Sequence, residues 1–384
     1  MSYYLAVKEV WRNKGRFFLF SLVIALITTL VLFIAALAEG LAAANKQYLE
    51  KLDADLIVFQ KNVDLSANAS RIGRSKVNDI RRIEGVSDVG QIGFSNATIV
   101  FPDNREPLDV SIIGIEPDKP GAPPVTSGNN LQLDRGSDIL IDANVVNRTG
   151  IKIGDIIRIK SIQGTNEEYY DLRVVGTTDG QQYLYQPSVF IPYRTWDQIR
   201  PQASSNPSLV ELTSNVVAVK LLENLDIETM REQIATQVDG IEVADIRTSY
   251  ESLPGYRVQQ STLNTQQFFT LLIGILVIGG FFQIQMLQKI PQIGVLKAIG
   301  ASNRTIAAAV IFQIIFVTTL GVLIGCLVTF GLALGIPENV PIMFLGNSVA
   351  IAIIALLLIG PIGGLVSVRL AISVEPLIAL GLSA

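Results

Sequence analysis

Few residues in this sequence of 384 could perform chemistry. There is no histidine, the commonest general base and metal ligand, and the single cysteine, Cys326, lies within an apolar stretch. The "RGSD" segment (residues 135–138) and the scattered carboxylates have no basic partner at an informative spacing, which indicates a solvated acidic surface. A G-x-x-x-x-G-K-[ST] phosphate loop is also absent. The sequence therefore predicts no catalytic residues, no metal site, no cofactor bound by this chain and no ATP hydrolysis by it alone.

One polar stretch between two apolar runs has a pattern that does suggest a function. It reads "KIPQIGVLKAIGAS" (289–302), and its apolar residues recur every three positions, which predicts a short amphipathic helix. Pro291 favours a helix start that breaks continuation from the preceding apolar run, and Gly300 favours the helix end. A helix that only reverses the chain at the membrane surface would show the same periodicity. The apolar positions are Ile290, Ile293, Leu296 and Ile299.

The elements that position this stretch are membrane spans. Four runs are long and apolar enough to cross a bilayer. The first has 22 residues, longer than the core of a cleaved signal peptide, so we expect it to remain as a span. The spans hold almost no ionisable residues, which argues against a secondary transporter. They are Phe17–Ala38, Phe268–Leu287, Ile306–Leu334 and Ser348–Val368.

Basic residues predict the orientation of these spans. They precede the first span and occupy the 289–304 segment, whereas the loop at 335–347 has none, so we expect both termini to be cytoplasmic. Residues 41–264 would then lie outside the cytoplasm. They hold 22 Lys and Arg against 30 Asp and Glu, which argues against nucleic acid as a partner.

The predicted fold is a membrane α-helical part with four transmembrane helices and an α+β extracytoplasmic domain with an inserted β-rich subdomain. Two flanks of the domain (53–116 and 214–247) each follow the order strand, helix, strand, and short strands fill the insert (117–213). In the second flank, Asp226 is the expected helix N-cap. The remaining predicted parts are an amphipathic helix (1–16), the first span with a helical stalk (17–52), a stalk with the second span (256–288), the polar segment (289–304), the last two spans (305–335 and 347–368) and a tail (369–384).

Two further groups of residues have expected roles. Tyr4, Trp11 and Arg12 are placed to anchor the amphipathic N-terminus at the membrane interface. Gly321 and Gly325 form a small-xxx-small pair that allows close helix packing, within the chain or between two copies.

The segment "IPQIGVLKAIGASNRTI" (290–306) resembles the signature that follows the second span in the MacB/FtsX family of ABC transporter permeases. The order of spans and the large outside domain on stalks are similar to the family too. The resemblance implies a coupling helix that docks on a separate ATPase subunit, which would hold ATP and Mg. Gln292 stands where the family has a glutamate, so an ion pair is not available there. The implied contact residues are Gln292, Ile293, Gly294, Leu296, Lys297, Ala298, Gly300 and Ala301.

Within the family the sequence is most similar to the permease of the cyanobacterial heterocyst glycolipid exporter. The family resemblance implies a homodimer. The closer one adds a tripartite exporter in a cyanobacterial inner membrane, with its large domain in the periplasm, a periplasmic adaptor, a TolC-like outer-membrane channel and a lipid-like substrate such as a glycolipid. One alternative is a permease of the same family that releases lipoproteins or regulates cell-wall hydrolases. Another is a membrane-anchored sensor or adhesion module without an ATPase.

Overall fold

The computed structural model describes the chain except for residues 1–13, 104, 202–211, 337–339, 374–384 and the side chain of Arg16. Contacts divide the chain into two compact units. The first unit takes its residues from 1–40 and 260–384, and the second is Leu41–Gln259. Residues 1–13 of the predicted amphipathic helix (1–16), with Tyr4, Trp11 and Arg12, and most of the predicted tail lie outside the described residues, and Lys14 already begins the first long helix.

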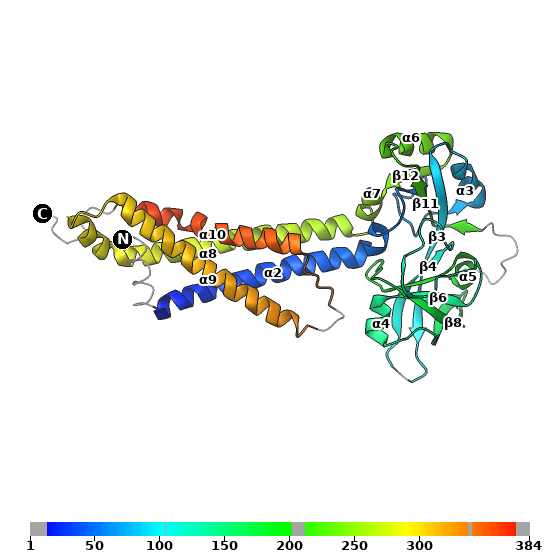
Figure 1. Ribbon diagram of the computed structural model, residues 1–384, viewed down its shortest axis with the longest axis horizontal. Coiled ribbons are helices and arrows are strands. Elements are labelled where there is room, and N and C mark those ends of the chain that lie inside the picture. The colour runs from blue at the N-terminus through cyan, green and yellow to red at the C-terminus, as the bar shows by residue number, and fades with distance from the viewer. Residues whose placement is uncertain (1–13, 104, 202–211, 337–339, 374–384) are drawn as a thin grey trace. The chain divides into compact units, whose positions relative to one another are not determined.

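The described residues of the first unit lie mainly in four long helices (Figure 1). Each is long and apolar enough to cross a membrane, and each coincides with one of the four predicted spans, of which only the third extends one residue past its helix, so the prediction of four spans is confirmed. The chain is therefore a multi-pass membrane protein. The helices are α2 (Lys14–Glu50), α8 (Tyr256–Ala298), α9 (Asn303–Ala333) and α10 (Gly346–Ser373).

Glycines bring the helices of the first unit into close contact. A Cβ atom added to Gly321 of α9 would lie 2.6 Å from the Cβ of Ile24 in α2, and one added to Gly363 of α10 would lie 2.9 Å from the Ile275 carbonyl of α8. Gly360 of α10 similarly leaves room only for a side chain of α9. Because lipid provides no hydrophobic drive between helices, such close packing supplies much of their association.

The second unit contains a ten-stranded sheet and, beside it, a two-stranded sheet of β2 and β10. The large sheet has the order β12-β1-β11-β3-β4-β9-β6-β8-β5, and β7 pairs with both β3 and β8. The strands are β1 (Leu56–Gln60), β2 (Ile72–Gly73), β3 (Val86–Val100), β4 (Leu108–Ile115), β5 (Val125–Gly128), β6 (Asp138–Asp142), β7 (Ile156–Gln163), β8 (Asn166–Thr178), β9 (Ser188–Pro192), β10 (Thr213–Ser214), β11 (Val216–Leu221) and β12 (Ile241–Asp245).

Strand pairing in part of this sheet closes on itself. The neighbours β3, β4, β9, β6, β8 and β7 lead back to β3 and form a small barrel, whose core includes Ile99, Ile112 and Ile141. The β-rich insert predicted at 117–213 is thus incomplete without β3 and β4, which precede it. The reason is the length of β3: its first half pairs with β11 and its last three residues pair with β7.

The two flanks of the domain meet in the other half of the sheet. β1 pairs with β11 and β12, and helices α3 (Arg74–Arg81) and α6 (Ile227–Gln237) share one buried cluster with these strands (Figure 1). Asp226 caps α6 by accepting from the Thr229 N–H at 2.8 Å, as predicted. Tyr48 packs in the cluster on the opposite face, and its hydroxyl donates to the Gly121 carbonyl at 2.8 Å. The remaining short helices are α4 (Ala143–Thr149), α5 (Tyr193–Ile199) and α7 (Ile246–Glu251).

One buried carboxylate joins two strands of the barrel to a neighbouring helix, so replacing it tests this part of the fold. Asp142, at the end of β6, is fully buried and accepts from the N–H groups of Val145 in α4 and Ser188 in β9, both at 2.9 Å. Asp142→Ala leaves two buried donors unpaired, so we expect the free energy of unfolding to fall by about 3 kcal/mol. Urea unfolding of the purified protein, followed by tryptophan fluorescence, measures the change.

The matched control is Asp138→Ala, at the other end of the same strand. Asp138 forms an exposed ion pair with Arg173 at 2.9 Å, so its loss should cost about 0.5 kcal/mol or less. Equal losses in the two variants would contradict the role assigned to Asp142.

Candidate functional site

The predicted coupling segment is not a separate helix. Residues 289–298 are the last turns of α8, which continues through Pro291, so the prediction of a break at that proline is wrong. Proline removes one backbone donor, a loss that the helix tolerates because the following residues are held by packing. Ile293 and Gly294 are buried, and Ile293 belongs to the same cluster as Ile306 and Val310 of α9.

The tight turn between α8 and α9 uses three successive residues in different ways. Gly300 has φ +96°, a conformation that favours glycine, and its N–H donates to the Lys297 carbonyl at 3.0 Å. The Ala301 N–H donates to the Leu296 carbonyl at 3.0 Å, which completes a Schellman motif. Ser302 then begins α9 as its N-cap, with its hydroxyl accepting from the Thr305 N–H at 3.3 Å. The Gly-Ala-Ser sequence therefore fixes how one helix ends and the next begins.

The exposed face of this turn is partly apolar. Val295 is 47% exposed and lies on the same side of α8 as the exposed Gln292, and Ile299, in the turn that follows, is 76% exposed. The sequence placed Ile299 with Ile293 in one apolar stripe, but only Ile293 is buried. The difference arises because α8 ends at Ala298, so the chain at Ile299 already belongs to the turn. We call Gln292, Val295 and Ile299 the turn face.

Two lysines connect this part of α8 to the other helices of its unit. The Lys297 ammonium donates to the Ile372 carbonyl in the last turn of α10 at 2.5 Å, a favourable position for a cation. The Lys289 ammonium donates to Gln313 Oε1 of α9 at 2.9 Å and lies 5.6 Å from the ring centre of Phe17 in α2. The last turns of α8 are thus tied to α2, α9 and α10, and the Lys297 ammonium is used within the chain.

The predicted packing glycines lie against α2 of the same chain. A Cβ atom added to Gly325 would be 2.5 Å from the Thr28 Cβ, and Gly321 is one turn earlier on the same face of α9. Since α2 occupies this face, the structure gives the pair an intramolecular contact.

A second contact of α2 was not anticipated from the sequence. Gly40 faces the backbone of Pro341, the Met343 N–H donates to the Ala36 carbonyl at 3.1 Å, and Glu39 accepts a hydrogen bond from the Ser348 hydroxyl at the start of α10. The glycine within a run of helix-forming residues was the available signal, because it marks a close backbone approach.

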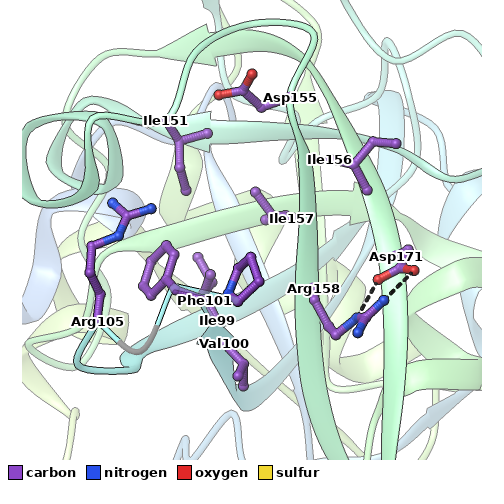
Figure 2. Close-up of a pocket in the computed structure, with 11 residues that line it drawn as sticks. Ile99, Val100, Phe101, Arg105, Ile151, Asp155, Ile156, Ile157, Arg158 and Asp171 are labelled. Carbon is purple, nitrogen blue, oxygen red and sulfur yellow. Dashed lines mark hydrogen bonds and ion pairs between the residues drawn. The ribbon is translucent and has the colours of Figure 1, made fainter.

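The second unit has a pocket of about 440 Å³ beside the end of β3, with an apolar lining that includes Ile99 (Figure 2). Both of its arginines are already paired: Arg158 Nε lies 2.7 Å from Asp171, and Arg105 Nε lies 2.7 Å from Asp103. Its other carboxylate, Asp155, accepts from the Lys152 backbone N–H at 2.9 Å. Figure 2 shows the Arg158–Asp171 pair at one side of the pocket. The pocket suits an uncharged, apolar group. No motif in the sequence indicated it.

Four apolar helices and a mixed sheet define the class of this molecule. It is a multi-pass membrane protein with one large domain between its first two spans. Two family descriptions match the chain: a MacB-like periplasmic core domain over residues 17–237 and an FtsX-like permease C-terminal region over residues 267–376. The chain belongs to the MacB/FtsX family of ABC transporter permeases and is a permease subunit of that type.

Similar proteins include one from Staphylococcus haemolyticus named as hemin transport system permease protein HrtB, 26% identical over 379 residues and covering 98% of this chain and 99% of that protein. The macrolide export ATP-binding/permease protein MacB of Psychrobacter arcticus is 23% identical over 266 residues, or 65% of this chain and 38% of that protein. The more specific resemblance to DevC, the glycolipid exporter permease, is not supported, and the inferred cyanobacterial origin loses its basis with it.

Two solved structures are also similar in part. The extracellular domain of the transporter YknZ from Gram-positive bacteria has a TM-score of 0.35 and 14% identity, covering 50% of this chain and 98% of that domain. The periplasmic region of MacB from Actinobacillus actinomycetemcomitans has a TM-score of 0.37 and 12% identity, and the match covers 53% of this chain and 95% of that region.

The contact of Gly325 with α2 gives a direct test of the helix packing. Gly325→Leu inserts a side chain where Thr28 already lies, so we expect a loss of about 2 kcal/mol and a lower midpoint of thermal unfolding in detergent. Gly331→Leu is the control on the same helix, because a Cβ there meets nothing within 4 Å. If Gly331→Leu lowers the midpoint as much as Gly325→Leu, the close packing of α9 on α2 is wrong.

Proposed function

We propose that the turn face is the docking surface for a separate ABC ATPase, and that this chain serves an exporter driven by it. The observation that carries the proposal is an exposed apolar residue, Ile299, directly after a helix end whose lysines bind α9 and α10. A large apolar side chain left this exposed beside polar groups suits a protein partner. Docking then depends on shape and apolar contact, since Gln292 provides no charge.

The distribution of basic residues supports a cytoplasmic position for this face. Lys289, Lys297 and Arg304 lie around the turn, whereas residues 335–347 contain no lysine or arginine. The positive-inside rule therefore puts the turn on the side of the membrane where ATP is available.

A rigid connection from the turn into the helices supports coupling by rigid-body motion. α8 runs unbroken from the turn back to Tyr256, and the lysine contacts join it to α9 and α10. A displacement at the turn would thus move several helices together, as in switches based on rigid-body rotation. The homodimer, periplasmic adaptor and TolC-like channel expected from the sequence stay predictions of this proposal.

For the substrate we propose a large apolar or amphiphilic molecule, with hemin as the first candidate. The support is that Staphylococcus relatives, 26% identical over nearly their whole length, are named for hemin transport, whereas the MacB relatives are named for macrolide export. Mycobacterial permeases matched over the same length carry names without a substrate. Hemin and macrolides are both bulky molecules with large apolar surfaces. A glycolipid shares that property, but no relative named above favours it.

The docking proposal predicts the effect of one charge at the turn face. Ile299→Asp should weaken co-purification with the ATPase about tenfold or more, because it places an unpaired carboxylate in an apolar contact. Ile162→Asp is the matched control, since Ile162 is also exposed but lies on β7 of the second unit. Membrane abundance and thermal unfolding of both variants establish that they fold. Unchanged ATPase recovery with folded Ile299→Asp would show that the partner docks elsewhere.

The substrate proposal predicts which compound stimulates the complex. With permease and ATPase reconstituted in liposomes, hemin should raise the ATPase rate severalfold over the basal rate, as expected when substrate binding shifts a conformational equilibrium. A glycolipid of similar apolar area is the comparison compound. Stimulation by the glycolipid but not by hemin would reverse the choice of substrate while leaving the docking proposal intact.

A further inference from the structure

A second, smaller pocket in the second unit has a different chemical character. It holds about 90 Å³ and lies between α3, β3 and the start of α5. Three arginines line it, Arg74 and Arg81 from α3 and Arg194 from α5. Arg74 and Arg81 are seven residues apart and so lie on the same face of their helix. A volume this small excludes drug-sized ligands, which need about 300 Å³ or more.

The three guanidinium groups are exposed and have no hydrogen bond or ion pair with any other residue that the structure describes. Most other arginines around the sheet are paired, as Arg158 with Asp171 and Arg173 with Asp138 illustrate. Arginine presents several donors in a planar fork that matches carboxylate and phosphate oxygens. Three such groups around one small hollow create a positive potential that favours an anion.

Two residues that line the pocket have buried polar atoms that also indicate a ligand. Tyr193 is 2% exposed, and its hydroxyl has no hydrogen-bond partner in the described chain. The Ser214 hydroxyl is a weak hydrogen-bonding neighbour of the Tyr193 hydroxyl, but its own hydrogen bond goes to the Ile72 carbonyl at 3.4 Å, so Tyr193 has no well-formed hydrogen bond. Burial raises the pKa of Tyr193, so its hydroxyl keeps its proton and is available as a donor.

The second atom is Gln91 Oε1, which is buried and also lacks a partner among the described residues. Its side-chain amide nitrogen donates to Glu116 at 3.0 Å, and its backbone N–H donates to the other Glu116 oxygen at 3.1 Å, so the orientation of Gln91 is fixed. Because buried polar atoms are rarely left unpaired, a ligand that satisfies both Tyr193 and Gln91 would remove two unfavourable terms. It must offer an acceptor to Tyr193 and a donor to Gln91.

The charges of the lining set the charge of that ligand. Asp134 and Glu116 are the acidic residues of the pocket, against three arginines, so the lining has a net charge of about +1 at neutral pH. Glu116 is occupied by the two N–H groups of Gln91. A small oxyanion that carries one hydroxyl group meets every requirement: acceptors for the guanidiniums and Tyr193, a donor for Gln91, and negative charge.

We propose that this pocket binds a phosphate group, with Arg74, Arg81 and Arg194 holding the oxygens and Tyr193 and Gln91 completing the hydrogen bonds. The phosphate is either the free ion, whose P–OH is the donor, or the terminal group of a small phosphate monoester such as a lipid headgroup, in which a hydroxyl of the alcohol part is the donor. The site is independent of ATPase docking, because it lies wholly within the second unit.

Isothermal titration of the full-length protein in detergent, in phosphate-free buffer, tests the site. Inorganic phosphate should bind with a dissociation constant below about 10 mM and more weakly at high salt. Arg74→Gln, Arg81→Gln and Arg194→Gln should each weaken binding about tenfold, whereas Arg173→Gln, which removes an exposed arginine elsewhere, should not. Tyr193→Phe keeps the ring that packs on Trp196 and should also weaken binding. Absence of phosphate binding, or equal binding by the arginine variants, would overturn the proposal.

Two further ligands separate the possible sources. If glycerol 1-phosphate binds with the same affinity as inorganic phosphate, the natural ligand is a phosphate headgroup. If only inorganic phosphate binds, the natural ligand is the free ion. Sulfate offers no hydroxyl donor to Gln91 at neutral pH, so we expect it to bind several times more weakly. Equal binding of sulfate and phosphate would overturn the role given to Gln91.

Discussion

The close approach of helix backbones at glycine is the constraint on which the membrane unit depends. In a bilayer, apolar side chains gain little by leaving lipid, so helices associate where their surfaces fit at short range. Gly321 and Gly325 fit α9 against α2, while Gly360 and Gly363 fit α10 against α9 and α8. The contacts of Lys289 and Lys297 depend on this arrangement, since together they join α8 to α2, α9 and α10.

The turn between α8 and α9 shows how one short sequence can meet both structural and functional requirements. Gly300 and Ala301 end α8 through backbone hydrogen bonds, and Ser302 begins α9 through its side chain. Of these three residues only Ala301 also packs its side chain against the buried cluster. The turn can therefore be stiff while its neighbours, Val295 and Ile299, remain available to a partner.

Much of the membrane unit could be predicted because its determinant, a long apolar run, is local in sequence. The end of α8 could not, since Pro291 favours a break and only packing of Ile293 and Gly294 overrides that preference. The barrel was missed for a related reason. Its closure depends on the parallel pairing of β4 with β9 and on β3 changing partners along its length, and alternation of apolar residues carries no information about partners. The arginine pocket likewise joins residues 74, 91 and 194, whose proximity only the fold creates.

The position of β1 in the sheet affects how the protein is made. β1 pairs only with β11 and β12, and Leu56 is matched to Val219 and Asp245. Its backbone donors and acceptors thus have no strand to pair with until the ribosome has added roughly 160 more residues, which takes about 10 to 30 s at ordinary elongation rates. During that interval an apolar strand with open edges follows a span already in the membrane. Biosynthesis of this domain therefore has a period in which assembly factors or aggregation compete for the same strand.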